Sequence, residues 1–386
     1  MLKLLKNAQV YAPQPIGRQD VLIAGEKILR IAPRIEGYDH LPDVEIYDIN
    51  GAILAPGLID LHVHVTGGGG EQGPVSRVPE IKLSELVESG ITTVLGLLGT
   101  DGISRSIENL LYKTRALQQE GITAFMLTGS YALPSATLTG DVTRDIALLN
   151  ECVGVKVALS DHRSSNLSLH ELIRLASDAR MGGLISGKAG IVVMHMGAGP
   201  KRLGLVRQAL EESDIPIKTF LPPPCGRNDA LIDEAIDFAR LGGVFDITGD
   251  IDPTPEHSCG RILRRAMDAG IPSGHVTISS DGCGSLPRFD EKGECVGLTY
   301  STPGVLMVEL RHAVCREGLP LELVLEALTS TPAKVLAQTG RKGCIAPGAD
   351  ADLMVLDDDL QVSGLLARGT LARWQGKTLL RGTFEA

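Results

Sequence analysis

The sequence of 386 residues lacks several features that would assign it to a broad class at once. No apolar run reaches the roughly 18 residues of a membrane span, and the N-terminal MLKLLKNAQVYAPQ has no sustained apolar stretch typical of export signals. The seven cysteines are odd in number and form no C-x-x-C pair, which favours reduced thiols. Basic residues number 37 against 47 acidic ones, so the formal charge is −10, and no basic stripe is present. These absences predict a cytoplasmic globular protein without a membrane or nucleic-acid partner.

The central part of the chain has the pattern of repeated βα units. From about residue 57 onward, short β-branched runs alternate with amphipathic stretches that end in glycine, such as SIENLLYKTRALQQEG. Eight strands are expected, at residues 57–64, 91–99, 122–131, 153–161, 190–197, 215–223, 243–250 and 275–282. Eight parallel strands with intervening helices predict an α/β protein with a (β/α)₈ TIM barrel.

The two ends of the chain have a different pattern from the centre. Residues 1–55 and 341–386 contain short strand patterns and turn residues but no long helix. We expect both ends to form one small β-sandwich-like domain, with the barrel at residues 56–340 inserted between its halves.

The first expected strand ends in two histidines, His62 and His64, followed at once by four glycines. Alternate side chains of a strand point to one face, so the two imidazoles would project together, while Leu61, Val63 and Val65 pack on the other side. Two adjacent imidazoles pack poorly in a core but are good metal ligands. A surface strand that carries two histidines is the alternative.

Three more strands bring groups of the same kind to the carboxyl rim, where such barrels carry their chemistry: Lys156, His195 and Asp281. Lys156 lies in the apolar run VGVKVALSD, where a buried ammonium would be costly. A neutral amine can add carbon dioxide and become an anionic carbamate ligand; a salt-bridged lysine is the alternative. His195 can be a ligand or a core histidine, and Asp281 a turn aspartate or the general base for a metal-bound water.

This ensemble resembles the amidohydrolase superfamily, and the finer sequence is similar to the bacterial isoaspartyl (β-aspartyl) dipeptidases over essentially the whole chain. The motifs that carry the resemblance are HVHVTGGGGEQGP, GLLGTDGISR, MLTGSYALPS, SDHRS, VMHMG, SSDGCGS and GADADLMVLD. The resemblance implies a metal-dependent hydrolase that cleaves the isopeptide bond of β-aspartyl dipeptides, and a homo-oligomer.

The resemblance also implies roles for individual residues. His62, His64 and Asp281 would bind one zinc, carbamylated Lys156 would bridge to a second, and His195 would serve the second. Asp281 would move the proton from water to the departing amine, and Tyr131 would stabilise the oxygen of the scissile amide. The substrate contacts implied are Glu71 to the α-ammonium, Arg163 and Arg227 to the carboxylates, and Gly69, Thr100 and Ser285 around the pocket.

One position departs from the family pattern. The resemblance implies a histidine ligand after the sixth strand, but FLPPPCGRN has Pro224 there, which offers no ligand atom. The first zinc should therefore be held firmly and the second weakly. Cys225 and His257 are two possible substitutes, and the sequence does not decide between them.

Two other functions stay open. One is a related amidohydrolase that acts on another N-acyl amino acid or a cyclic amide, although Glu71, Arg163 and Arg227 together favour the dipeptide. The other is a degenerate barrel that binds without turnover, which Pro224 alone suggests.

Overall fold

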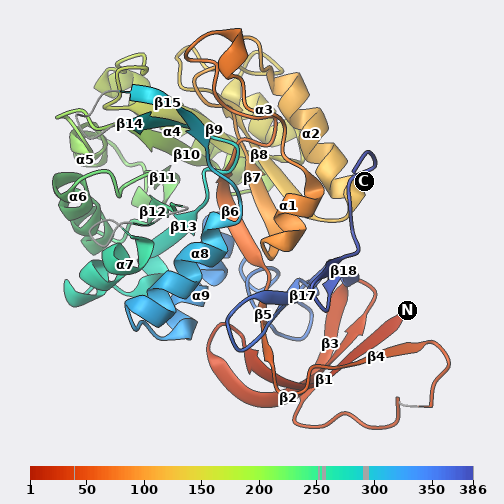
Figure 1. Ribbon diagram of the computed structural model, residues 1–386. Coiled ribbons are helices and arrows are strands. Elements are labelled where there is room, and N and C mark those ends of the chain that lie inside the picture. The colour runs from red at the N-terminus through yellow and green to blue at the C-terminus, as the bar shows by residue number, and fades with distance from the viewer. Residues whose placement is uncertain (39, 251–252, 254–257, 290–294, 386) are drawn as a thin grey trace.

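The structure, a computed structural model, describes residues 1–38, 40–250, 253, 258–289 and 295–385. Within these residues, eight parallel strands surround the centre of the larger part of the molecule (Figure 1). They are β6 (Leu58–Val63), β7 (Ile91–Gly96), β8 (Thr123–Gly129), β9 (Cys152–Leu159), β10 (Ile191–Met196), β11 (Phe220–Leu221), β12 (Phe245–Thr248) and β13 (Val276–Ser279). The predicted TIM barrel is therefore confirmed.

Backbone hydrogen bonds close the barrel at the two places where the regular ladders stop. Between β11 and β12, Cys225 N donates to Asp246 O at 2.9 Å. Between β13 and β6, His64 N donates to Gly282 O at 2.8 Å. The second closure brings the ends of the first and last barrel strands together.

The sixth barrel strand is much shorter than the predicted residues 215–223. The chain forms a short helix, η2 (Ile217–Thr219), and then only two residues of strand. Prolines explain the difference: Pro216 precedes η2, and Pro222, Pro223 and Pro224 lack the N–H groups that a parallel ladder needs.

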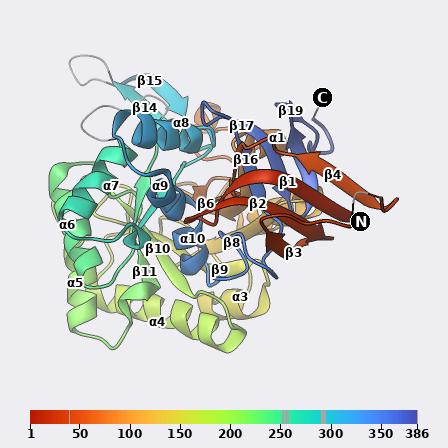
Figure 2. The same ribbon diagram turned by 90° about the horizontal axis from the view of Figure 1, so that it is seen from below.

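Helices cover the outside of the barrel (Figure 2). The longest is α4, where Ser168 and Glu171 form a capping box and Gly187 ends the helix with a φ of 68°. The helices are α1 (Leu83–Glu88), α2 (Ile107–Glu120), α3 (Val142–Leu148), α4 (Leu169–Ser186), α5 (Gly204–Glu211), α6 (Asp229–Arg240), α7 (Cys259–Asp268), α8 (Val305–Arg311), α9 (Leu321–Leu328) and α10 (Ser330–Val335). The remaining short turns of helix are η1 (Pro74–Ser76), η3 (Ser273–His275) and η4 (His312–Arg316). No helix of the described residues is long and apolar enough to cross a membrane.

Both ends of the chain contribute to one nine-stranded sheet, which packs below the barrel in Figure 1. Its strands are β1 (Leu2–Tyr11), β2 (Pro15–Ala24), β3 (Lys27–Ala32), β4 (Val44–Asp48), β5 (Ile53–Pro56), β16 (Leu353–Leu356), β17 (Val362–Ala367), β18 (Thr370–Trp374) and β19 (Lys377–Thr378). The two halves join where β5 pairs antiparallel with β16, with Pro56 opposite Leu353. A separate apolar core that includes Leu5, Leu54 and Leu366 holds this sheet together. The exact domain boundaries stay a prediction.

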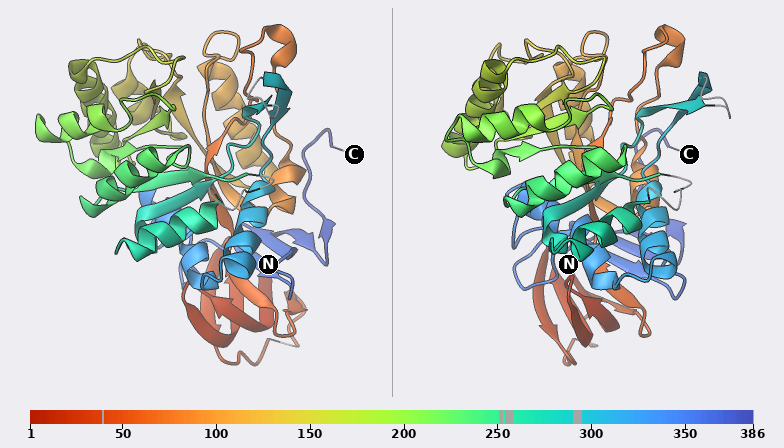
Figure 3. Two further views of the ribbon diagram at one scale, coloured as in Figure 1. Left: turned by 60° about the vertical axis from the view of Figure 1, so that its left-hand side comes forward. Right: turned by 90° about the vertical axis from the view of Figure 1, so that its left-hand side faces the viewer.

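A hairpin of β14 (Ser285–Phe289) and β15 (Cys295–Tyr300) follows the last barrel strand. Figure 3 shows this hairpin beside the loop that carries η1. Both segments therefore stand at the carboxyl end of the barrel, where the strands deliver their polar side chains.

Candidate active site

A cavity of about 280 Å³ opens at the carboxyl end of the barrel. We call it the site cavity. It is lined by His64, Gly69, Glu71, Gly99, Thr100, Tyr131, Asp161, His162, Arg163, His195, Ala198, Arg227, Asp281, Gly284, Ser285 and Leu286. The lining includes every predicted site residue except His62 and Lys156, which are buried side chains that hydrogen-bond to each other. The structure thus brings the predicted residues together, although their roles stay predictions.

The two histidines of the opening motif lie where β6 ends. His62 is in the strand and His64 follows its last residue, and both are buried. Val63 and Val65 join the main apolar core, whereas Leu61, predicted to pack with them, belongs to a separate apolar cluster. The Nε2 atoms of His62 and His64 lie 3.4 and 3.1 Å from Asp281 Oδ1, which has no hydrogen-bond partner in the described structure.

These three side chains fit a zinc ion. Their ligand atoms lie within 4.8 Å of one another, and no other group of three or more His, Cys, Asp or Glu among the described residues does so. Zinc bonds of about 2.0–2.2 Å in a tetrahedral site place neighbouring ligand atoms about 3.3 Å apart, close to the two observed distances. A buried carboxylate oxygen that faces two ring nitrogens at these distances is an arrangement that a cation would satisfy.

Buried side chains fix the relative position of these ligands. Asp60 accepts from His62 N at 3.2 Å and from Ser280 N at 3.1 Å, so it links β6 to the residue before Asp281. Burial raises the pKa of Asp60 to about 6, against the hydrogen bonds that it accepts. Burial also favours a neutral Asp281, but His62 and His64 outweigh it and hold the pKa of that carboxyl well below its usual range.

Lys156 lies in β9 with its side chain fully buried. Its Nζ is 3.2 Å from His62 Nε2, and it forms no ion pair within 4 Å among the described residues. Burial lowers its pKa from 10.5 to about 7, opposed by the charges of Asp281 and Asp246. The salt-bridged lysine that the sequence left open is therefore not what the structure describes, and a large neutral fraction at neutral pH suits carbamate formation.

His195, in β10, contacts protein groups through both ring nitrogens. Tyr131 Oη lies 2.7 Å from Nδ1, and the two rings stack with centroids 4.4 Å apart. Asp161 Oδ2 lies 3.2 Å from Nε2. Burial lowers the pKa of His195 to about 3, and burial raises the pKa of Tyr131 well above its ordinary value. A neutral imidazole thus lies beside a phenol that keeps its proton.

Charged side chains of both signs meet at the mouth of the cavity. Arg163 Nη1 lies 3.2 Å from Glu71 Oε1, while its Nε and Nη2 both donate to Asp161 at 2.9 Å. Glu71 also accepts from Thr100 Oγ1 and Ser285 Oγ, each at 3.1 Å. The hydrogen bond with Asp161 raises the pKa of Arg163, so its charge is permanent.

The four glycines form a structured loop rather than a flexible turn. Gly69 has a φ of 77°, and a Cβ there would lie 2.2 Å from Ser76 O. The buried Arg105 donates to the carbonyls of Thr66, Gly68 and Val78, which ties the loop to the chain on either side. This bracing places Glu71 at the cavity mouth.

The departure from the family pattern is visible after β11. Pro224 is buried and follows a cis peptide bond, and its side chain offers no ligand atom. The Cys225 thiol donates to Pro222 O at 3.0 Å and packs in the core between barrel and helices, not on the cavity. His257 lies outside the described residues. Cys225 is therefore not positioned to serve His195.

The sequence interpretation missed Asp60 and Asp161. Asp60 stands two residues before the first histidine, and Asp161 stands inside the quoted motif SDHRS two residues before Arg163. The signal in the sequence was an aspartate within or directly after an apolar strand run, where its side chain is expected to be buried.

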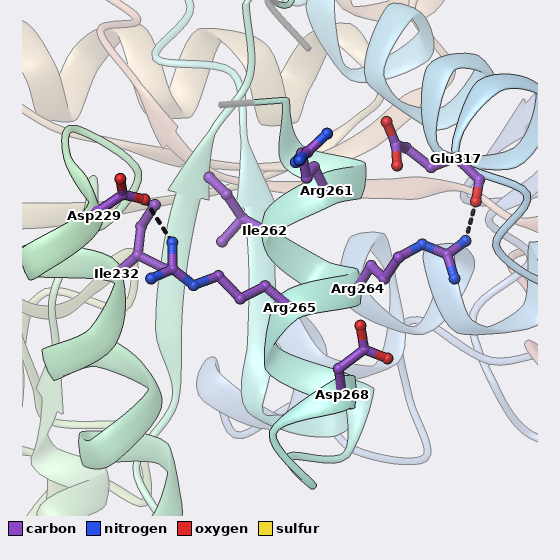
Figure 4. A pocket seen from close by; sticks show the side chains of 8 residues that line it. All are labelled: Asp229, Ile232, Arg261, Ile262, Arg264, Arg265, Asp268 and Glu317. Atoms are coloured by element: carbon purple, nitrogen blue, oxygen red, sulfur yellow. Dashed lines mark hydrogen bonds and ion pairs between the residues drawn. The ribbon is translucent and has the colours of Figure 1, made fainter. Parts of the chain in front are cut away.

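A larger groove of about 710 Å³ lies on the outside of the barrel between α6, α7 and η4 (Figure 4). Arg265 pairs there with Asp229 at 2.6 Å, and Arg264 donates to Glu317 O. Its arginines are therefore largely engaged with neighbouring helices. The predicted catalytic and binding residues line the site cavity and not this groove.

Comparisons with known proteins agree with this geometry. The β-aspartyl dipeptidase from Fervidobacterium islandicum AW-1, solved in complex with β-Asp-Leu dipeptide, is 41% identical, and the match covers 98% of this chain and 97% of that one with a TM-score of 0.92. The dihydroorotase of Lactobacillus johnsonii is 23% identical over 98% of this chain and 97% of its own length. A D-hydantoinase structure at 15% identity and a TM-score of 0.69, which covers 100% of this chain and 98% of its own, shares the fold.

The Amidohydrolase family matches residues 260–379, which include the last barrel strand with Asp281. With a match of 41% identity over nearly the full length of both chains, the chain belongs to the β-aspartyl dipeptidases of the amidohydrolase family.

Proposed function

We propose that this hydrolase is a zinc-dependent isoaspartyl dipeptidase that cleaves the isopeptide bond of β-aspartyl dipeptides. Such a substrate carries an ammonium and a carboxylate on one carbon. Glu71 and Arg163, 3.2 Å apart at the mouth of the cavity, offer the two opposite charges side by side. This pair, in the same cavity as the candidate zinc ligands, is the observation that carries the proposal.

Zinc would be held by His62, His64 and Asp281, and would supply Lewis acidity that makes water a nucleophile near neutral pH. Lys156, once carbamylated, would add an anionic ligand beside His62. The position near His195 would hold a second zinc only weakly, since Pro224 provides no ligand.

The remaining residues would orient the substrate and transfer protons during its hydrolysis. Asp281 stays ionised because its pKa is low, so it can take a proton from the attacking water and pass it to the departing amine. Tyr131 keeps its proton and would donate it in a hydrogen bond to the scissile carbonyl oxygen. Arg163 and Arg227 would bind the carboxylates, with Gly69, Thr100 and Ser285 completing the pocket.

A related amidohydrolase activity on a cyclic amide is the second candidate, favoured by the dihydroorotase likeness. A cyclic amide has no ammonium, so this candidate gives Glu71 no substrate charge to bind.

The test combines elemental analysis of purified protein with turnover assays. We expect bound zinc, hydrolysis of β-Asp-Leu, and little hydrolysis of α-Asp-Leu, N-acetyl-β-Asp-Leu or dihydroorotate. Turnover of dihydroorotate without turnover of β-Asp-Leu would establish the second candidate. Zinc-loaded protein that turns over none of these would indicate a non-catalytic barrel.

We also propose that the chain forms a homo-oligomer. On α4, Met181, Leu184 and Ile185 are more than half exposed, which is unusual for neighbouring large apolar side chains. Light scattering after size exclusion should give a multiple of 40.9 kDa, and Leu184→Glu should lower it. A monomeric wild-type protein would contradict this.

A further inference from the structure

His195 and Tyr131 form one coupled unit at the wall of the site cavity. Both side chains are buried, their rings stack at 29°, and Tyr131 Oη lies 2.7 Å from Nδ1 of the imidazole. One ring nitrogen of His195 therefore contacts the phenol to which the proposed function assigns the scissile carbonyl oxygen.

Two guanidinium groups and the carboxylate of Asp161, whose Oδ2 is 3.2 Å away, face the other nitrogen. Arg163 Nη2 lies 3.2 Å and Arg227 Nη2 3.4 Å from His195 Nε2. Asp161 holds the first of these arginines, because its Oδ1 accepts from the backbone N and Nε of Arg163 and its Oδ2 from Nη2. Arg227 is held separately, by donation from its Nε to Met196 O at 2.7 Å.

This arrangement does not fit a cation at His195. A zinc ion bound to Nε2 would lie about 2.0–2.1 Å from it, in the space toward which two positively charged groups are directed. The carboxylate in this space, Asp161, is already paired with Arg163. Pro224 adds no ligand, and the Cys225 thiol is bonded to Pro222 O. Among the described residues, His195 belongs to no group of three metal-ligating side chains.

We infer that His195 is a positioning residue for Tyr131, and that Arg163, fixed by Asp161, takes the place of a second cation at its Nε2. The inference rests on the proposed function. It assigns a role to Asp161, and it makes the enzyme a one-zinc hydrolase.

The hydrogen-bond directions follow from the donors present. Arg163 and Arg227 can only donate to Nε2, whereas Asp161 Oδ2, 3.2 Å from the same atom, can only accept from it. Because Asp161 already accepts from Arg163, we assign Nε2 as the acceptor of the two guanidinium groups and place the proton of the neutral imidazole on Nδ1. Nδ1–H then donates to Tyr131 Oη. The phenol proton is left free to point into the cavity, toward the oxygen of the scissile amide. The opposite tautomer, with Nε2–H donating to Asp161, would turn that proton toward His195.

The arginines divide their donors between protein and cavity. Arg163 uses Nε and Nη2 on Asp161 and His195 and directs Nη1 toward Glu71. Arg227 uses Nε and Nη2 on Met196 and His195, and its Nη1 has no hydrogen-bond partner in the described part of the chain. A substrate carboxylate can therefore bind the Nη1 atoms while the contacts with His195 persist.

The experiment compares His195→Gln, Tyr131→Phe and the double variant, with His62→Ala as the control for zinc loss. We expect one zinc per chain in the wild-type protein and in His195→Gln, and less in His62→Ala. Loss of one oxyanion donor lowers kcat by about 10²–10³-fold. We expect Tyr131→Phe and His195→Gln each to fall in this range and the double variant to be no slower than Tyr131→Phe.

Two zinc ions per chain in the wild type, one of them lost in His195→Gln, would overturn the inference. Losses in kcat that multiply in the double variant would overturn it as well, because His195 would then act independently of Tyr131. Asp161→Asn provides a second route if His195→Gln does not fold: its loss in kcat must also vanish in the Tyr131→Phe background. If β-Asp-Leu is not a substrate, the proposed function fails, but the zinc count still tests the second site.

Discussion

Replacement of Asp246 by asparagine should stabilise the protein in a pH-dependent manner. Asp246 lies in β12, is fully buried, and accepts hydrogen bonds from Thr277 Oγ1 at 2.6 Å and from Ser279 Oγ. Burial raises its pKa from 3.8 to about 8, the charge of Asp60 adds to this, and Lys156 opposes it. The folded protein therefore keeps a proton on Asp246 that the unfolded chain loses at low pH.

The size of the effect follows from proton linkage. Because the folded state binds more protons between pH 3.8 and 8, the free energy of unfolding decreases as the pH rises through this range. The full difference between the two pKa values corresponds to at most about 6 kcal/mol. Asparagine has the same shape and keeps an oxygen acceptor without a titrating proton. Asp246→Asn should thus have nearly wild-type stability at pH 4 and be more stable by several kcal/mol at pH 8.5.

Urea unfolding of chelator-treated protein, followed by circular dichroism from pH 4 to 8.5 at constant ionic strength, measures this difference. Asp268→Asn, at an exposed aspartate on the same barrel, is the control and should leave the pH dependence unchanged. If the advantage of Asp246→Asn does not grow with pH, Asp246 is ionised in the folded protein and the reasoning is refuted.

Three further predictions concern the site. Lys156→Ala should abolish turnover of β-Asp-Leu, and short carboxylic acids should partly restore it by replacing the carbamate; an alanine variant with wild-type kcat would make Lys156 a plain barrel residue. Glu71→Gln and Arg227→Ala should each weaken substrate or transition-state binding by roughly 2–5 kcal/mol, measured as kcat/KM, whereas equal activity of either variant would contradict the charge recognition. Pro224→His should raise the zinc content measured by elemental analysis; two tightly bound ions in unmodified protein, retained in Cys225→Ala/His257→Ala, would show that proline removes no ligand.

The sequence was sufficient for features that repeat or sit in short motifs. The barrel follows from alternating βα patterns, and His62, His64 and Asp281 could be placed together because strand ends of a parallel barrel share one rim. Asp281 lies there although it stands 217 residues after His64, the difference of the two residue numbers.

Features that depend on distant neighbours were not predictable in the same way. The role of Asp161 depends on its contacts with Arg163 and His195. The role of Arg105 depends on the carbonyl groups of the glycine loop that it binds. The shortness of the sixth strand was not predicted either. The apolar run IPIKTFL has a strand pattern, but the flanking prolines lack the N–H groups that the parallel ladder needs.

The pairing of β5 with β16 has a consequence for the order of folding during synthesis. Pro56 and Leu353 are partners in this ladder, so about 300 residues of chain must be made between them, which takes roughly 15–60 s at 5–20 residues per second. Until then the apolar core of the N-terminal sheet lacks Leu353 and Leu366, and the edge of β5 that pairs with β16 has no hydrogen-bonding partner. The first 56 residues are thus the part of the nascent protein that waits longest for its partner, and the part at which a chaperone would protect it from aggregation.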